Sequence, residues 1–263
     1  MTTQVQRPRF PILALLHPRE RTGLVLAALA IGLALWYAAV GLLHQPVWVG
    51  TALALALLLL AGALKWRDDL RRHGAAVAVL SVLLAAQGFH SVEHAAQMVQ
   101  YHLLQWPPFA SSGLISAANS EWVHFVWNWL LVAAIAFLAL RGGMRGVWAW
   151  LLLAWSLAHA IEHAYMFARY LMMVDELGRL GFPSLSAQGL PGILGRDGWL
   201  ARAPATQGTF LCRLPGLTTA PRIDVHFWWN AGEITLLLAA AHTFLRERLA
   251  LAPRRLSDGD RQE

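Results

Sequence analysis

The chain contains little charge and almost no cysteine. Only 14% of its 263 residues are charged, whereas 57% are hydrophobic and the mean hydropathy is +0.46. A typical soluble domain carries about 25% charged residues, so this chain has too little charge to cover a soluble globule of its size. The single cysteine, Cys212, excludes an internal disulfide and any cysteine-based metal site. Thirteen tryptophans, a residue type that gathers at membrane interfaces, complete a composition that predicts an integral membrane protein.

The net charge of +6 could suggest a nucleic-acid partner, but the arginines are not arranged for one. They flank apolar runs instead of forming a patch or stripe. The partner that this sequence predicts is the lipid bilayer, and no nucleic acid is expected.

Six apolar segments are long enough, or nearly so, to cross a bilayer core of about 30 Å, which requires roughly 20 residues of helix. The sequence therefore predicts an all-α integral membrane protein with a bundle of six transmembrane helices. The predicted spans are 23–43, 47–64, 75–103, 121–141, 146–172 and 223–245.

Basic residues set the direction of these spans. Arginine and lysine gather in 1–22, 65–73, 141–145 and 246–261, whereas the connections 44–46 and 104–120 contain neither. Because basic connections stay on the cytoplasmic side, both termini are predicted to be cytoplasmic and the protein to reside in the plasma (inner) membrane.

The chain contains an internal repeat from about residue 75 onward. "GFHSVEHAAQMVQYH" (88–102) and "LAHAIEHAYMFARY" (157–170) share the pattern H-x-x-E-H-A-x5-Y, and "VHFVWN" (123–128) later matches "VHFWWN" (225–230). Spans three and four are thus predicted to repeat as spans five and six, in parallel about an axis along the membrane normal. The predicted organisation is a cytoplasmic N-terminal arm (1–22), an accessory hairpin (23–64), a first repeat (75–141), a second repeat (146–249) that includes a long external loop (173–222), and a cytoplasmic tail (250–263).

The repeated polar residues form stripes, because positions three and four apart share one face of a helix. With the predicted topology, all six repeated histidines lie in the outer half of the bilayer, where polar side chains face the bundle interior. Imidazole suits Zn, Cu, Fe and Ni, whereas carboxylates favour Fe or Mn. The sequence therefore predicts two metal ions, Cu or Fe with Zn as the alternative. The expected ligands are His90, Glu93, His94, His124, His159, Glu162, His163 and His226.

Other polar residues follow the same stripes. Asn128 and Asn230 are expected to orient the ligands, although hydrogen bonding between helices explains them equally well. Tyr101 and Tyr170 are candidates for proton donors or redox-active phenols, or for anchors at the membrane interface. Glu233 joins the two motif glutamates, Glu93 and Glu162, as a candidate general base.

The ligand positions resemble those of known metal sites. An HxxxH pair with a third histidine, present twice, is similar to the ligand pattern of coupled dinuclear (type 3) copper proteins. Histidine-rich membrane desaturases and hydroxylases also gather such boxes around two metal ions. H-x-x-E-H is also the inverted zincin motif of certain peptidases. The first two resemblances imply oxidative chemistry, and the third implies hydrolysis.

Several functions remain open from the sequence. The leading one is a membrane oxidoreductase of the oxidase or oxygenase type, acting on a lipophilic or membrane-associated substrate with an electron donor. The alternatives are a metal carrier, sensor or transporter, an intramembrane zinc hydrolase, a haem-binding membrane cytochrome, and a purely structural polar network.

Overall fold

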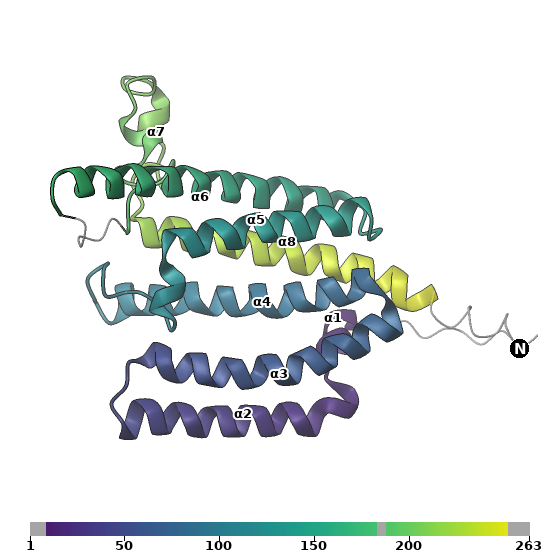
Figure 1. The fold of residues 1–263 in the computed structure, drawn as a ribbon. Helices are drawn as coiled ribbons and strands as arrows, with labels where there is room; N and C mark the ends of the chain where they lie inside the picture. The colour runs from purple at the N-terminus through teal and green to yellow at the C-terminus, as the bar shows by residue number, and fades with distance from the viewer. Residues whose placement is uncertain (1–8, 183–187, 252–263) are drawn as a thin grey trace, which may run out of the picture.

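The computed structural model describes residues 9–182 and 188–251, which are helical throughout apart from turns and loops (Figure 1). The predicted all-α class is confirmed over these residues. Parts of the predicted N-terminal arm, external loop and tail (1–8, 183–187 and 252–263) lie outside them. The α-helices are α1 Pro11–Leu16, α2 Thr22–Tyr37, α3 Val47–His73, α4 Ala75–Met98, α5 Glu121–Leu140, α6 Val147–Arg179, α7 Trp199–Arg202 and α8 Arg222–Leu251. The π-helical turns Ala38–Leu42 and Val99–Leu103 extend α2 and α4, and 3-10 turns cover Arg19–Arg21, Ser116–Asn119 and Phe210–Arg213.

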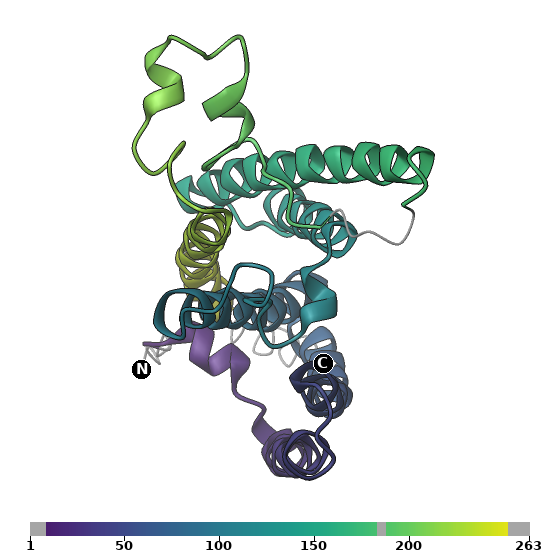
Figure 2. The same ribbon diagram turned by 90° about the vertical axis from the view of Figure 1, so that its left-hand side faces the viewer.

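The long helices lie side by side with roughly parallel axes. The α2–α3 hairpin occupies one edge of the bundle, and the segment around α7 projects from the opposite edge beyond α6 (Figure 2). Helices α4, α5, α6 and α8 surround a shared core whose side chains are at most 5% exposed. Its members include Leu80, Leu83, Leu131, Ile135, Leu138, Leu152, Leu237 and Leu245.

Four helical segments among the described residues are long and apolar enough to cross a membrane: Arg19–Leu42, Val47–His73, Ala75–Leu103 and Glu121–Leu140. They support a membrane protein and coincide with the first four predicted spans. Helices α6 and α8 fall short because they carry the second set of polar residues, among them His159, Glu162 and Glu233. The six-span count therefore stays a prediction.

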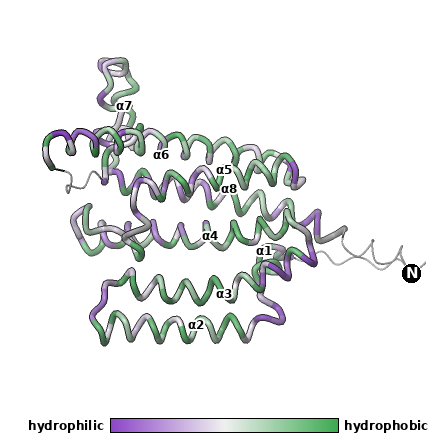
Figure 3. Tube along the Cα trace, in the orientation of Figure 1, coloured by the Kyte–Doolittle hydropathy of each residue, from purple (hydrophilic) through white to green (hydrophobic). Residues whose placement is uncertain are grey.

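The outer surface of the hairpin is apolar, as Figure 3 shows by its colour along α2 and α3. Leu26, Ile31 and Leu33 on α2 are 59%, 55% and 58% exposed. A large exposed apolar surface of this kind is unfavourable in water. It suits a helix whose surroundings are lipid.

Two boundaries differ from the sequence prediction. The basic stretch 65–73, expected as a connection, continues α3 to His73, and the chain turns only at Gly74, whose φ is +81°. Lys65 can stay inside because it pairs with Asp69 one turn later and donates to Ser81 Oγ on α4 over 2.6 Å. Similarly, α6 runs on to Arg179, so the first residues of the segment expected as an external loop (173–222) are the end of α6.

Candidate metal centre

All six repeated histidines meet in one place. His90 and His94 lie one turn apart on α4, and their Nε2 atoms are 3.2 Å apart. His159 and His163 repeat this arrangement on α6, with their Nε2 atoms also 3.2 Å apart. Two nitrogens that bind one tetrahedral ion at about 2.0–2.1 Å lie about 3.3 Å apart, so both pairs have the separation of ligands to a shared ion.

His124 on α5 completes a first trio with His90 and His94. One ligand atom from each of these three histidines lies within 4.8 Å of the others, so this trio could hold a metal ion. His94 and His124 are buried, whereas His90 is partly exposed.

The second trio consists of His159, His163 and His226, the last of which lies on α8. Its members are nearly inaccessible, at 0%, 1% and 5% exposure. The ring centroids of His163 and His226 are 5.0 Å apart.

The two trios are in direct contact with each other. The His124 ring stacks on the His163 ring with centroids 5.2 Å apart, and the His124 and His226 centroids are 6.4 Å apart. His94 stacks on His226 at 6.2 Å. The six imidazoles therefore form one continuous cluster, to which α4, α5, α6 and α8 contribute.

Backbone carbonyls fix the tautomer of two of these rings. His124 Nδ1 faces the carbonyl of Ser120 at 3.3 Å, and His226 Nδ1 faces the carbonyl of Arg222 at 2.9 Å. A carbonyl can only accept, so Nδ1 carries the hydrogen and Nε2 keeps its lone pair. This is the arrangement that metal-binding histidines usually have. The Nε2 atom of His226 is buried and has no hydrogen-bond partner, as expected of a nitrogen placed to bind an ion.

The two trios differ three residues after the second histidine of each motif. Gln97 Oε1 lies 3.0 Å from His94 Nδ1, whereas Met166 takes the corresponding place beside His163. The Nδ1 atom of His163 is buried without a partner.

A buried network supports the cluster from the apolar side. Glu233 Oε2 on α8 lies 3.3 Å from His159 Nδ1 and accepts a hydrogen bond from Gln87 Nε2 on α4 at 2.9 Å. Trp127 Nε1 donates to Gln87 Oε1 at 3.3 Å. The sequence prediction included Glu233 but missed Gln87. The available signal was a single buried amide in an apolar run, one turn before His90.

The motif glutamates contact loops in the structure. Glu93 accepts the backbone N–H groups of Leu114 at 2.5 Å and Ile115 at 2.7 Å. Glu162 Oε1 accepts those of Ile193 at 3.0 Å and Leu194 at 3.2 Å. The histidine trio that could hold a metal does not include Glu93. A ligand role for the two glutamates stays a prediction, and their observed contacts tie one loop to the last turns of α4 and another loop to the middle of α6.

The predicted supporting residues have mixed positions. Asn128 is buried and donates to the backbone carbonyl of His124 at 2.9 Å, and Asn230 is 2% exposed with its Nδ2 unpartnered. The ring contacts of Tyr101 and Tyr170 are with His102 and Phe167. Asn128 therefore contacts a residue of the cluster, and Asn230 is buried one turn after His226, while the structure gives the tyrosines contacts elsewhere.

The donor set fits a metal better than a haem. Each imidazole in the cluster has other imidazoles as its nearest ring neighbours, at centroid distances of 4.6 Å for His90–His94 and 4.9 Å for His159–His163. A porphyrin needs a flat slot between its two axial histidines, and these neighbouring rings fill that space. Comparisons with protein-family models, with curated proteins and with solved structures give no match for this chain.

Proposed function

We propose that this chain is an integral membrane metalloprotein with a dinuclear histidine centre, and that it acts as an oxidoreductase on a membrane-associated substrate. It has six spans, of which α6 and α8 are the last two. Both termini face the cytoplasm, and the centre lies in the outer half of the plasma membrane. The first trio (His90, His94 and His124) binds one ion and the second trio (His159, His163 and His226) binds the other.

The observation that carries this proposal is that the Nε2 atoms of the histidines face one another in pairs within the cluster. His94 and His159 each have an acceptor at Nδ1, so their Nε2 lone pairs point toward a second imidazole 3.2 Å away. A network made only of hydrogen bonds leaves the buried His226 Nε2 without a partner. Such unpaired buried groups cost about 1–3 kcal/mol each. An ion bound by Nε2 would satisfy His226, and it would take the place of the Nε2–H···Nε2 hydrogen bonds that His90 and His163 could otherwise donate.

The surroundings favour oxidation of a lipid-soluble substrate. Cu or Fe would supply one-electron changes, so that a pair of ions could couple a two-electron oxidation of the substrate to reduction of O2. An apolar cavity of about 500 Å³ borders His90 and His124 and gives such a substrate access to the first trio. Glu93 lines this cavity as well and is the candidate to accept a proton from the substrate.

The apolar core argues against a metal transporter. Leu80, Leu131 and Ile135 fill the space between the helices beyond the cluster and are at most 2% exposed. A cation pathway needs polar side chains or water at each step. The packing therefore favours an enzyme over a carrier. The identity of the metal distinguishes the oxidoreductase from a zinc hydrolase with the same ligands.

Elemental analysis of the detergent-purified protein tests the proposal directly. We expect two Cu or Fe ions for each chain in the wild type. His124→Ala and His226→Ala should each lower that ratio. The matched variant His242→Ala, on α8 but outside the cluster, should leave it unchanged. A wild type that contains two Zn ions would overturn the oxidoreductase and favour the zinc hydrolase. A wild type without bound transition metal, or with a haem Soret band, would overturn it.

A further inference from the structure

Two cavities lie end to end between α3, α4 and α5. The first, of about 500 Å³, reaches from Leu59 and Trp66 to His90 and His124. The second, of about 510 Å³, extends from Trp66 to Arg67 and Ala75 near the turn between α3 and α4. Each volume is within the range of small-molecule sites.

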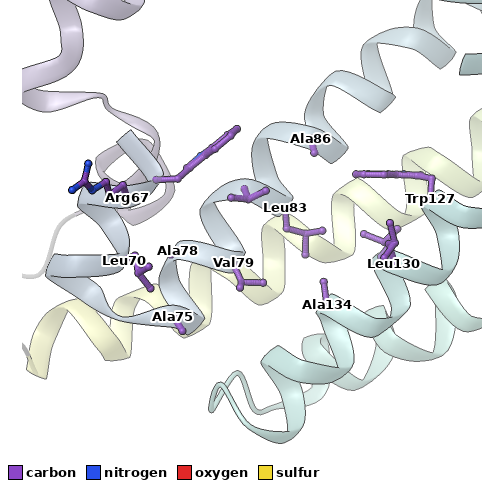
Figure 4. Close-up of a pocket in the computed structure, with 13 residues that line it drawn as sticks. Arg67, Leu70, Ala75, Ala78, Val79, Leu83, Ala86, Trp127, Leu130 and Ala134 are labelled. Carbon is purple, nitrogen blue, oxygen red and sulfur yellow. The ribbon is translucent and has the colours of Figure 1, made fainter. Parts of the chain in front are cut away.

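The two cavities share three lining residues, one from each helix: Trp66, Ala86 and Trp127. Figure 4 shows the second cavity, with Arg67 and Leu70 toward one end and Ala86 and Trp127 toward the other. Together the cavities form one groove, which we call the α4 groove. It follows α4 from Ala75 to His90, a rise of about 22 Å at 1.5 Å for each residue.

The shape and lining of the α4 groove fit an extended apolar chain. Leu70, Val79 and Leu83 line its middle and far part, and Arg67 is the one charged residue that lines the second cavity. The groove lies along helices that are long and apolar enough to cross a membrane, so its surroundings are lipid. Its length covers most of a hydrocarbon core of about 30 Å, so a long chain fills it better than a compact molecule does.

The end of the groove at the histidines indicates the polar group of the occupant. The described residues that line that cavity include Glu93, His90 and His124, and none of them is a lysine or an arginine. A phosphate or carboxylate head would have no cationic side chain there and would meet the Glu93 carboxylate. An uncharged polar head such as a hydroxyl can approach the imidazoles without this repulsion.

The groove reaches only one of the two trios. His90 lines it, whereas its counterpart His159 is completely buried, with Glu233 at its Nδ1 and Trp229 stacked on its ring at 5.4 Å. The wall that creates the groove comes from α3, which belongs to the hairpin outside the sequence repeat. The hairpin therefore makes the two repeats different: the first trio borders a cavity, and the second trio is closed.

We propose that the α4 groove binds one long-chain, lipid-soluble substrate, with its apolar chain between Trp66 and Trp127 and its uncharged polar end beside His90 and His124. This proposal rests on the function given above, because the occupant of the groove is a substrate only if the protein is an enzyme. Binding in the groove itself depends only on the cavities described here.

Photo-crosslinking tests the groove in the full-length protein in phosphatidylcholine vesicles. The probe is a long-chain primary alcohol with a diazirine at mid-chain, and mass spectrometry locates the labelled peptides. We expect label on the segments that contain Trp66, Ala86 and Trp127, and competition by the unlabelled alcohol. Ala86→Trp places an indole ring at the junction of the two cavities. It should lower the labelling about tenfold, because a misfit of even one methylene group in an apolar pocket lowers affinity by about that factor.

The matched variant is Ala133→Trp, which adds the same side chain at an exposed position of α5 outside both cavities. It should label like the wild type. The position of the label in the wild type tests the groove even if Ala86→Trp fails to fold. Label spread over the lipid-facing surfaces of α2 and α6, and unchanged in Ala86→Trp, would show ordinary surrounding lipid and overturn the proposal. Label that an added anionic phospholipid displaces but the unlabelled alcohol does not, and that Arg67→Ala abolishes, would reverse the orientation and overturn the assigned polar end.

Metal content, measured on the same samples, separates this proposal from the function it rests on. His226→Ala, which lies outside the lining of both cavities, should lose metal while the groove retains its label. A labelled groove in a wild type without metal would overturn the metalloenzyme and leave a lipid-binding groove. A wild type with two ions but without label in the groove would overturn the groove alone.

Discussion

Each motif glutamate holds a short loop that contains a glycine at its start. Glu93 contacts "GLI" (113–115), and Glu162 contacts "GIL" (192–194). A Cβ added at Gly113 or Gly192 would overlap the carboxylate of Glu93 or Glu162. These glycines therefore let the backbone come close enough to donate both N–H groups to the carboxylate.

Replacing Gly192 by alanine should displace the 192–194 loop from Glu162. The loss of two hydrogen bonds to a buried carboxylate is expected to cost about 2–4 kcal/mol, and thermal unfolding in detergent measures it. Gly178→Ala on α6 is the control, because a Cβ there meets nothing within 4 Å. That variant should be as stable as the wild type or slightly more stable, since alanine favours a helix. Equal stability of the two variants would contradict a structural role for the contact.

Glutamine substitutions should affect the two loops differently. Both loop N–H groups at Glu162 go to one oxygen, Oε1, so the amide oxygen of Glu162→Gln can accept both. At Glu93 each oxygen accepts one N–H, so Glu93→Gln places an NH2 group against a backbone donor. Hydrogen–deuterium exchange should therefore accelerate at 114–115 in Glu93→Gln and stay unchanged at 193–194 in Glu162→Gln.

The metal content of the same two variants tests the glutamates as ligands or as charges that offset the ion. A loss of about 10–100-fold in metal affinity in Glu162→Gln, with its loop intact, would support that role. Unchanged metal affinity in the Glu93→Gln, Glu162→Gln double variant would show that the two glutamates hold the loops and do not act on the metal.

Residue patterns predicted the histidine cluster because helical spacing is regular. Positions 90 and 94, and likewise 159 and 163, share a face in any α-helix, and polar faces in a membrane bundle turn inward. The loop partners of Glu93 and Glu162 were not predictable in the same way. Their positions depend on the path of irregular segments, for which the sequence offers no period.

At the scale of the elements, α4 and α8 are joined by the hydrogen bond between Gln87 and Glu233. Helix α5 has Leu131 where α8 has Glu233, seven residues after the matching histidine, so the carboxylate serves the second trio alone. A carboxylate that orients a ligand imidazole typically contributes about 10–100-fold to metal affinity.

Glu233→Ala should therefore weaken the second metal site and leave the first. At limiting metal, the ratio should fall from two ions toward one for each chain. The exposed Glu247→Ala, also on α8, is the control and should retain both ions. Equal loss of both ions would indicate that the trios do not bind independently, and no loss would remove Glu233 from the site.

The helix boundaries show where hydropathy misleads. A run of charged residues ended the predicted second span at residue 64, yet α3 continues for more than two turns. Lys65 and Asp69 are 7% and 3% exposed because they satisfy each other and Ser81 inside the bundle. A sequence shows which residues are charged but not which of them pair. Paired charges inside a helix are therefore mistaken for a connection between two spans.

At the scale of the whole molecule, the number of helices that cross the membrane decides on which side the connection between α6 and α8 lies. Six spans and four spans both leave the two termini on the same side, so labelled termini cannot distinguish them. The connection between α6 and α8 can, because it lies opposite the termini only if both of these helices span. This connection contains Cys212, the single cysteine of the chain, in a partly exposed 3-10 turn.

We predict that a membrane-impermeant maleimide labels Cys212 in intact cells. In the six-span arrangement the apolar stretches of α6 and α8 carry the loop to the outer side, where the reagent reaches the thiol. The internal control is Arg145→Cys in a Cys212→Ala background, since the exposed Arg145 lies in the short basic turn between α5 and α6. That thiol should react only after the membranes are lysed, because the positive-inside rule places the turn in the cytoplasm. Labelling of Cys212 only after lysis, with the control also protected, would place the loop with the termini. It would limit the protein to four spans, and the histidines of α6 and α8 would then have to meet those of α4 and α5 at the membrane surface.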